Sequence, residues 1–120
     1  MTTAHQIASD APPPVPPLLR IEVTGTSDVV DVRLFGEMDL STRGQLESAV
    51  AQTHLNGAPQ VRLDLAGLDF CDASGLSELI AVREALVAQQ RSCAALSAQP
   101  SVLRLLTISG LIGLFALLPA

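Results

Sequence analysis

A short polar turn, Asp72-Ala73-Ser74-Gly75, holds the residues best suited to chemistry, because it brings a carboxylate and a hydroxyl together directly after an apolar run. Asp72 and Ser74 are both residue types that accept hydrogen bonds from the free N–H groups at a helix start. Gly75 adds no side chain there, so we expect this helix end to be presented openly to solvent or to a partner. A surface of that kind recognises or carries charge.

Asp39 provides a second carboxylate, at the end of the segment Gly36-Glu37-Met38-Asp39. Together Asp39 and Asp72 could form a metal site or an acid–base pair. We favour the simpler roles of turn former and helix cap, because Asp is common at such positions. The cysteines, Cys71 and Cys93, have no CxxC neighbour and no histidine at metal-ligand spacing, so we expect no metal site and no cofactor.

Ser74 and His54 admit an enzymatic alternative, a hydrolase with a serine nucleophile. Two features argue against it: no third orienting group stands at a recognisable position, and the turn around Ser74 does not match the Gly-x-Ser-x-Gly elbow. His54 instead falls in the last turn of a predicted helix, ahead of Asn56-Gly57, where a partial positive charge favours the helix dipole. We therefore expect no catalytic residue.

Cys71 directly precedes the polar turn, and two roles for its thiol stay open. Packing is the simpler role, and a redox switch is the alternative, because the thiol adjoins a polar surface. The amino terminus lacks a basic region followed by an apolar core, which argues against secretion. We therefore expect a cytoplasmic protein whose two thiols are reduced.

The composition limits the classes of protein to which the chain can belong. Its 120 residues, with a hydrophobic fraction of 48%, suffice for one domain with a single core. The formal net charge is −5, the 7 cationic residues are all arginines scattered singly, and there are 3 Phe but no Trp or Tyr. No basic stripe or aromatic platform is thus available for a nucleic acid, and we expect a protein partner with basic patches.

Both ends of the chain have a biased composition. Residues 1–17 include Ala11-Pro12-Pro13-Pro14-Val15-Pro16-Pro17, which predicts a disordered leader, with a docking segment for a proline-binding domain as the alternative. The folded domain is expected to span residues 18–120. Leu105 to Leu118 carries no charge, but it falls well short of the roughly 20 residues that a membrane-spanning helix needs. Glycines interrupt it, so we predict a soluble protein with a helix followed by a short buried strand here.

Alternating apolar and polar residues predict the first strands. Residues 19–24 and 29–35 both alternate with period two and flank the turn-like Gly25-Thr26-Ser27-Asp28, which predicts an antiparallel hairpin. Gly36-Glu37-Met38-Asp39 breaks the alternation, and Ser41 can cap a helix that runs as far as His54. The face of this helix that is expected to pack on the sheet carries Leu46, Ala49, Val50 and Thr53.

A strand–helix–strand unit follows. Residues 60–65 and 92–97 are predicted strands and residues 75–89 the crossover helix, so the two strands are expected to be parallel. One face of this helix carries Leu76, Leu79, Ile80, Leu86 and Val87, whereas Ser77, Glu78, Ala81, Glu84 and Ala85 point elsewhere. Arg83 interrupts the apolar face. Either its stem covers the core while its guanidinium reaches water, or it pairs with a carboxylate of the sheet or of a partner.

These residues resemble the STAS domain, the module shared by bacterial anti-sigma factor antagonists and sulfate transporters. The resemblance covers nearly everything after Leu18. It rests on Gly36-Glu37-Met38-Asp39, on Leu63-Asp64-Leu65 leading to Phe70-Cys71-Asp72-Ala73-Ser74-Gly75-Leu76, and on Pro100 through Leu111. It implies an α/β fold, a single STAS-like domain whose small mixed β-sheet has helices packed mainly on one face, and no catalytic activity.

The same resemblance implies an anti-sigma factor antagonist, which binds a serine-kinase-like anti-sigma factor and thereby releases a sigma factor to RNA polymerase. Such a protein regulates transcription positively without touching nucleic acid. The residues expected at the partner surface are Asp39, Asp72, Ala73, Ser74, Gly75, Leu76, Glu78 and Arg83. The alternative is a cytosolic STAS subunit of a lipid-importing membrane transport complex.

Phosphorylated members of the family carry the modified Ser or Thr immediately after the motif Asp, where this chain has Ala73. The usual off switch therefore lacks its hydroxyl, and Ser74 is the next candidate for phosphorylation. A phosphate there would add about −1.5 to −2 charge at a helix start and oppose an interface beside Asp72 and Asp39. The alternative is that Ser74 only caps the helix and is never modified.

Overall fold

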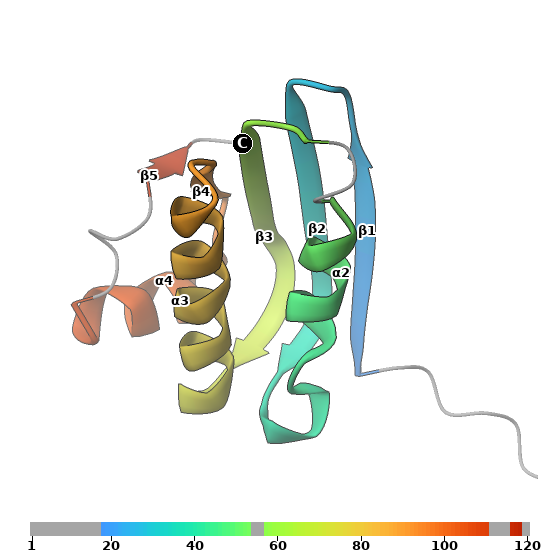
Figure 1. Ribbon diagram of the computed structural model, residues 1–120. Helices are drawn as coiled ribbons and strands as arrows, with labels where there is room; N and C mark the ends of the chain where they lie inside the picture. Colours follow the sequence, from blue (N-terminus) through green and yellow to red (C-terminus); the bar gives the residue numbers. More distant parts are fainter. Residues whose placement is uncertain (1–17, 54–56, 111–115, 119–120) are drawn as a thin grey trace, which may run out of the picture.

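The computed structural model describes residues 18–53, 57–110 and 116–118, which form a five-stranded sheet with helices packed on it (Figure 1). The predicted leader, residues 1–17, lies outside this part of the chain, as do His54 and Asn56. In chain order the elements are β1 (Leu19–Gly25), β2 (Val29–Met38), the 3-10 helix η1 (Leu40–Thr42), α2 (Gln45–Thr53), β3 (Gln60–Cys71), α3 (Ala73–Ala88), β4 (Ser92–Leu96), α4 (Pro100–Ile108) and β5 (Ala116–Leu118).

The strands lie in the sheet in their chain order, β1-β2-β3-β4-β5. β1 and β2 form the predicted antiparallel hairpin, and its turn is closed by a hydrogen bond that Thr26 N donates to Val29 O (2.8 Å). The remaining pairs are parallel, so the sheet is mixed, as expected. Because β2 and β3 are parallel, their carboxyl ends meet at the same end of the sheet, where Asp39 and Asp72 follow them.

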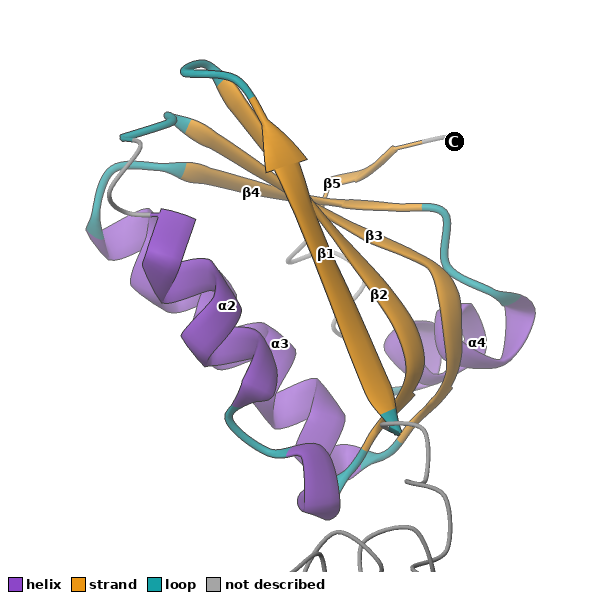
Figure 2. Cartoon of the chain, turned by 90° about the vertical axis from the view of Figure 1, so that its right-hand side faces the viewer, coloured by secondary structure: helices purple, strands orange, loops and turns teal. Residues whose placement is uncertain are grey.

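One face of the sheet carries the core. Inward-facing residues such as Val32 and Leu63 are fully buried, and α2 and α3 lie side by side along this face (Figure 2). Leu106 of α4 borders the same interior region as Leu79 of α3, against Leu63 of the sheet, so α4 covers part of this face too. The helices therefore pack mainly on one face, as the resemblance implied.

The opposite face of the sheet is polar. The Arg62 guanidinium donates to both carboxylate oxygens of Asp31, at 2.6 and 2.8 Å, and Arg33 lies 3.7 Å from Asp64. These pairs join neighbouring strands but remain partly exposed, so each contributes little to stability. Their main effect is to keep this face hydrated.

Two strands are longer than the sequence pattern predicts. The pattern ends the third strand at Leu65, but β3 continues to Cys71, because Leu68 and Cys71 are buried as well. β2 likewise continues through Gly36 to Met38, and a register shift between β2 and β3 absorbs the break in alternation. Gly36 has a φ of 103° and lies against the backbone just before β1, where a side chain would not fit.

The buried face of α3 differs from the predicted one. Val82 is buried, whereas Val87 is 50% exposed, and Glu78 is only 4% exposed although the pattern directs it away from the core. The charge within the buried stripe is thus Glu78 rather than Arg83, which is half-buried. Glu78, Val82 and Leu86 follow one another at intervals of four residues, the spacing that keeps side chains on one helix face.

A helix and a short strand follow β4 in the predicted order. α4 begins at Pro100, whose fixed φ suits the first helical position. β5 pairs in parallel with β4, and the burial of its side chains lies outside what the structure describes. No helix within the described ranges is long and apolar enough to cross a membrane.

Candidate partner-binding site

The turns that follow β2 and β3 lie together at one end of the sheet, at the bottom of Figure 1. Asp72 N donates to Met38 O (3.2 Å), which ties the second turn to the end of β2. Asp39 directly precedes η1, and Asp72 directly precedes α3. The two predicted carboxylates therefore occupy the same end of the molecule.

Asp39 caps η1. Its carboxylate accepts hydrogen bonds from Ser41 N (2.9 Å) and Thr42 N (3.3 Å), and Asp39 N donates to Thr42 Oγ1 (3.0 Å). This reciprocal arrangement is a capping box. The prediction that Ser41 caps the first helix is therefore wrong, and Ser41 instead donates its hydroxyl to the Asp39 carboxylate (2.6 Å).

Asp72 caps α3, as predicted, because its carboxylate accepts a hydrogen bond from Gly75 N (3.1 Å). Ser74 does not cap the helix. It lies inside the first turn of α3, and within the described part of the chain its side chain makes no hydrogen bond. The capping role considered for Ser74 is thus wrong, and its hydroxyl is left available.

Gly75 is buried, contrary to the expectation that its missing side chain opens the helix end to solvent. A Cβ at this position would lie 2.7 Å from Cys71 Sγ and 2.8 Å from both Cβ and O of Met38. Glycine here lets the first turn of α3 approach the strand ends closely. Leu76 is 8% exposed, so neither residue offers much surface to a partner.

The carboxylates at this end are used as caps. Asp39 and Asp72 each direct oxygen atoms at backbone N–H groups, which confirms their roles as turn former and helix cap. In the ranges that the structure describes, no three His, Cys, Asp or Glu side chains gather into a group that could hold a metal ion. Neither a metal site nor an acid–base pair is therefore needed to explain these residues.

Glu78 also accepts hydrogen bonds from backbone N–H groups at a helix start, but its side chain is buried. Its carboxylate accepts hydrogen bonds from Gly44 N (3.1 Å), Leu46 N (2.9 Å) and Glu47 N (3.1 Å), which are unpaired donors around the start of α2. A negative charge here also complements the dipole of α2. The expected place of Glu78 at a partner surface conflicts with this arrangement, because the carboxylate is buried and already used within the chain.

The surface left around these caps mixes apolar and polar groups. Leu40, which follows Asp39, is 67% exposed, and Phe70, at the end of β3, is 47% exposed. Ala73 is exposed at the start of α3. Ser74 lines a pocket of about 350 Å³ between the beginnings of α2 and α3, together with Arg43, Glu47, Ser77, Glu78 and Ala81. We call the group Asp39, Leu40, Phe70, Asp72, Ala73 and Ser74 the Asp72 end.

A model of the STAS domain family matches residues 20–119. The chain belongs to the STAS domain family. An anti-sigma-B factor antagonist of Staphylococcus epidermidis is 28% identical over 93 residues, which cover 78% of this chain and 86% of that protein. The crystal structure of an anti-sigma factor antagonist from Mycobacterium paratuberculosis has a TM-score of 0.75 at 26% identity and covers 85% of this chain and 86% of that one.

A third comparison concerns the fold alone. The structure of the Bacillus cell fate determinant SpoIIAA in the phosphorylated form has a TM-score of 0.65 at 22% identity, and it covers 84% of this chain and 91% of that one. The family that the sequence motifs suggested is therefore confirmed by a family model and by the fold.

In this STAS domain, Ala73 occupies the first position of α3, directly after the cap Asp72. The nearest hydroxyl is one residue further along, on the half-buried Ser74. One step along an α-helix turns the side chain by about 100°, so Ser74 leaves the helix in a different direction from Ala73. The hydroxyl of Ser74 lies at the pocket beside α2, whereas residue 73 faces outward.

The two thiols of this STAS domain are poorly suited to redox chemistry. Burial, reinforced by the charge of Asp72, raises the pKa of Cys71 to about 11. Burial also raises the pKa of Cys93 to about 11, against the opposing influence of Arg83. Since the thiolate is the reactive form, the structure favours packing over a redox switch at Cys71. The charge of Arg83 thus influences Cys93 in β4, and the role of Arg83 at a partner surface stays a prediction.

Arg91 is a structural residue that the sequence pattern does not single out. It is 7% exposed, and its Nε donates to Ala58 O (2.6 Å). Its Nη2 donates to Thr53 Oγ1 (3.2 Å) and Thr53 O (3.5 Å) at the end of α2. A guanidinium at this position complements the carboxyl-terminal end of the α2 dipole. This role depends on tertiary contacts, because these partners of Arg91 lie more than thirty residues earlier in the chain.

Proposed function

We propose that this STAS domain is an anti-sigma factor antagonist. It binds a serine-kinase-like anti-sigma factor in the cytoplasm and thereby frees a sigma factor for RNA polymerase, so its effect on transcription is positive and needs neither catalysis nor contact with DNA. The observation that carries the proposal is the similarity to proteins named anti-sigma factor antagonists, over 78% of the chain in sequence and with a TM-score of 0.75 in structure.

The Asp72 end supplies the binding surface. Leu40 and Phe70 offer apolar area there, and exposed apolar side chains rimmed by polar groups are typical of protein interfaces. The caps Asp39 and Asp72 fix the backbone of both turns before a partner arrives, which lowers the entropy cost of binding. The net charge of −5 favours a partner with basic patches.

Control by phosphorylation moves from residue 73 to residue 74 in this proposal. Ala73 has no hydroxyl, whereas the Ser74 hydroxyl has no hydrogen-bond partner among the described residues and lines a surface pocket. A phosphate on Ser74 would add about −1.5 to −2 charge. Arg43 and the helix start tolerate this charge in the free protein, but a packed partner would have to desolvate it beside Glu47 and Asp72. Phosphorylation therefore weakens binding.

Affinity capture tests the class of partner. The full chain is used as bait in a lysate of its source organism, and the bound proteins are identified by mass spectrometry. The proposal expects an anti-sigma factor related to serine kinases. A transporter ATPase in its place would contradict the proposal and support a STAS subunit of a lipid-importing membrane complex.

Two bait variants locate the surface. Leu40→Asp places a charge at the Asp72 end, and Val87→Asp places the same charge on another exposed apolar residue, 50% exposed near the other end of α3. Loss of the partner with Leu40→Asp and its retention with Val87→Asp would support the Asp72 end as the binding surface. The reverse pattern would place the interface elsewhere.

A further inference from the structure

β1 is an edge strand whose outer side is open. It pairs only with β2, and no described strand or helix covers its other edge, which faces the viewer in Figure 2. Glu37 N donates to Leu18 O (2.8 Å), and backbone groups of successive residues alternate in direction along an antiparallel ladder. The N–H and C=O groups of Leu19, Ile21 and Val23 therefore point away from β2, at the open edge.

The sequence of this strand alternates between apolar and charged residues, with opposite charges on the two sides of Ile21. Leu19-Arg20-Ile21-Glu22-Val23 reads apolar, positive, apolar, negative, apolar. The apolar residues lie on the core side of the sheet, and Arg20 and Glu22 lie on the outer side, where they form an ion pair with each other. Arg20 also lies over the ring of Phe35, 4.1 Å from its centre. The two charges are thus held along the edge.

We propose that β1 pairs with β1 of a second copy of this chain, antiparallel and with the two-fold axis at Ile21. This register places Arg20 opposite Glu22 of the second copy and Leu19 opposite Val23. The outward backbone groups of Leu19, Ile21 and Val23 then fall in the hydrogen-bonded pairs of the new ladder. The charges fall in the closer non-hydrogen-bonded pairs, where side chains interact most strongly.

The neighbouring registers do not offer this match. Centring the two-fold axis on Arg20 sets two guanidinium groups against each other, and centring it on Glu22 sets two carboxylates against each other. Charges on an edge strand ordinarily prevent such pairing. Here the same two charges select one register, because only the axis at Ile21 turns them into two opposite-charge pairs.

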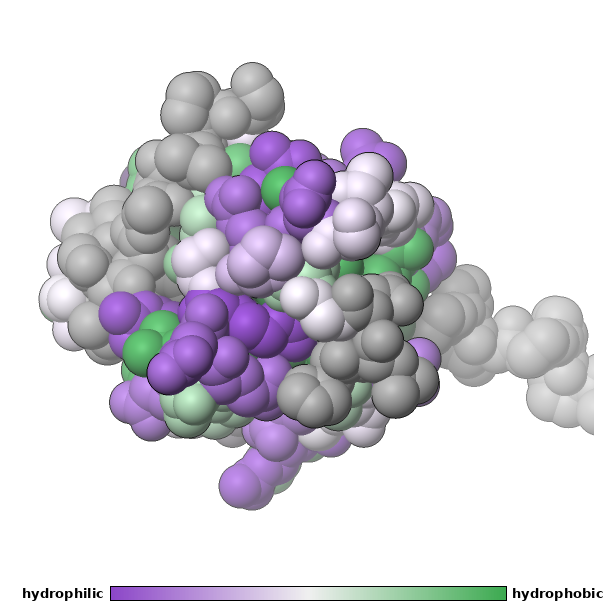
Figure 3. Space-filling model, turned by 45° about the horizontal axis from the view of Figure 1, so that its top comes forward, coloured by the Kyte–Doolittle hydropathy of each residue, from purple (hydrophilic) through white to green (hydrophobic). Residues whose placement is uncertain are grey.

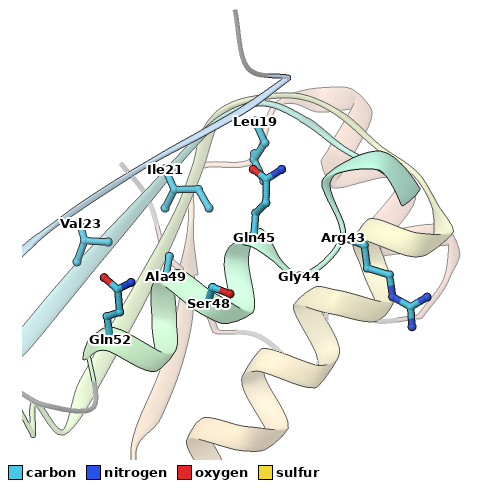
Figure 4. A pocket seen from close by; sticks show the side chains of 9 residues that line it. All are labelled: Leu19, Ile21, Val23, Arg43, Gly44, Gln45, Ser48, Ala49 and Gln52. Atoms are coloured by element: carbon cyan, nitrogen blue, oxygen red, sulfur yellow. The ribbon is translucent and has the colours of Figure 1, made fainter.

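A groove beside the edge adds apolar surface that a second copy would cover. It has a volume of about 740 Å³, and Figure 4 shows the side chains of Leu19, Ile21 and Val23 on the sheet side, facing α2. Val23 is 45% exposed. Polar side chains of α2, among them Gln45 and Gln52, form the other wall. A second β1 would continue the apolar floor across the axis.

Charge reversal gives the test, with sedimentation velocity of the full chain over a range of concentrations as the measurement. The wild type is expected to form a dimer. Arg20→Glu alone or Glu22→Arg alone converts both symmetry-related pairs into like-charge pairs. The dissociation constant of the dimer should therefore rise at least about tenfold for each variant. The double variant Arg20→Glu/Glu22→Arg restores opposite charges across the axis and should regain the dimer.

Mixing the two single variants sharpens the test. Each variant should form a weak homodimer. Arg20→Glu and Glu22→Arg chains, however, present opposite charges to each other at both positions, so the mixture should form a heterodimer. Arg104→Glu and Glu84→Arg make the same charge changes at exposed positions outside β1 and should leave the wild-type association unchanged.

A backbone variant tests the ladder itself. Val23→Pro removes an N–H that points at the open edge and leaves the hydrogen bonds between β1 and β2 intact, so it should abolish the dimer while circular dichroism shows a folded protein. A wild type that stays monomeric up to high concentration would overturn the proposal. So would a dimer that both single charge reversals and Val23→Pro leave intact.

Discussion

At both ends of the α2–α3 helix pair, charged side chains satisfy backbone hydrogen-bonding groups, but the exposed surfaces of the two ends differ. At the Asp72 end, the carboxylates of Asp39, Asp72 and Glu78 turn inward onto backbone N–H groups. At the opposite end, which we call the Arg91 end, the guanidinium of Arg91 turns inward onto carbonyl and hydroxyl oxygens, among them those of Thr53. Both ends of α2 thereby receive a charge of the sign that its dipole favours.

What remains outside differs between the ends. The Asp72 end exposes Leu40 and Phe70 together with Ala73 beside a polar pocket. The surface that Figure 3 brings forward, the end at the top of Figure 1, is mostly hydrophilic over the described residues, with only scattered hydrophobic ones. Buried charge thus serves the fold at both ends, whereas the exposed apolar area beside a polar pocket supports the proposal that the Asp72 end binds the partner.

The largest effect on stability is expected at the Arg91 end. Arg91→Met keeps the buried stem but leaves the Ala58 carbonyl and the Thr53 hydroxyl without their donor, which should lower the free energy of unfolding by about 2–4 kcal/mol. Urea denaturation measures the loss. Arg104→Met, at an exposed position, is the matched control and should change stability little. An Arg91→Met protein as stable as the wild type would contradict the stabilising role assigned to the buried guanidinium.

Glu78 provides the counterpart at the Asp72 end. Glu78→Gln keeps the shape but removes the charge and one of the two acceptor oxygens that serve three backbone N–H groups of the α2 start. We expect a loss of about 1–3 kcal/mol in the same urea experiment. Glu84→Gln, exposed on the same helix, should have almost no effect. Equal stability of the two variants would contradict the assigned role of Glu78.

Gly75 tests how closely the first turn of α3 must approach the strand ends. A methyl group there would meet Cys71 Sγ at 2.7 Å and Met38 O at 2.8 Å, so Gly75→Ala should cost about 1–3 kcal/mol despite the better helix propensity of alanine. Ser77→Ala, at an exposed position in the next turn, should be neutral. A stabilised Gly75→Ala protein would show that the turn relaxes freely.

The smallest change in stability and the sharpest change in control are expected from Ala73→Ser. Residue 73 is exposed at the helix start, so the substitution should alter stability by no more than about 0.5 kcal/mol. It restores a hydroxyl directly after the cap Asp72. Incubation with the cognate kinase-like partner and ATP should then yield phosphate on the introduced hydroxyl, detected by mass spectrometry. An unmodified variant would contradict the assignment of that partner as a kinase.

Local patterns predicted much of this fold. Period-two alternation gives the β1–β2 hairpin, and the run of strand, helix and strand after residue 60 gives the parallel unit, because both signals depend on neighbours in sequence. The end of β3 was missed because a register shift hides the continued burial of Leu68 and Cys71. The cap Asp72 was predicted correctly, since capping is local as well.

The remaining parts of the site depend on tertiary contacts. A helix projection places Glu78 on the polar side of α3, and only the free N–H groups of α2, more than thirty residues earlier, make that position favourable for a carboxylate. Arg91 likewise acquires its partners from the end of α2 and from Ala58, just before β3. The buried state of Gly75 follows from its contact with Met38, which no spacing in the sequence reveals.

We propose that an anti-sigma factor binds at the Asp72 end and that negative charge on Ser74 opposes this binding. Ser74 and Ser101 are each the second residue of a helix, so a carboxylate at either one meets the same helix dipole. Isothermal titration of the captured anti-sigma factor should therefore be made with the wild type, Ser74→Asp and Ser101→Asp. We predict that Ser74→Asp weakens binding at least about tenfold, roughly 1.4 kcal/mol, while Ser101→Asp binds like the wild type. Equal affinities for all three proteins would show that the partner does not contact the surface around Ser74.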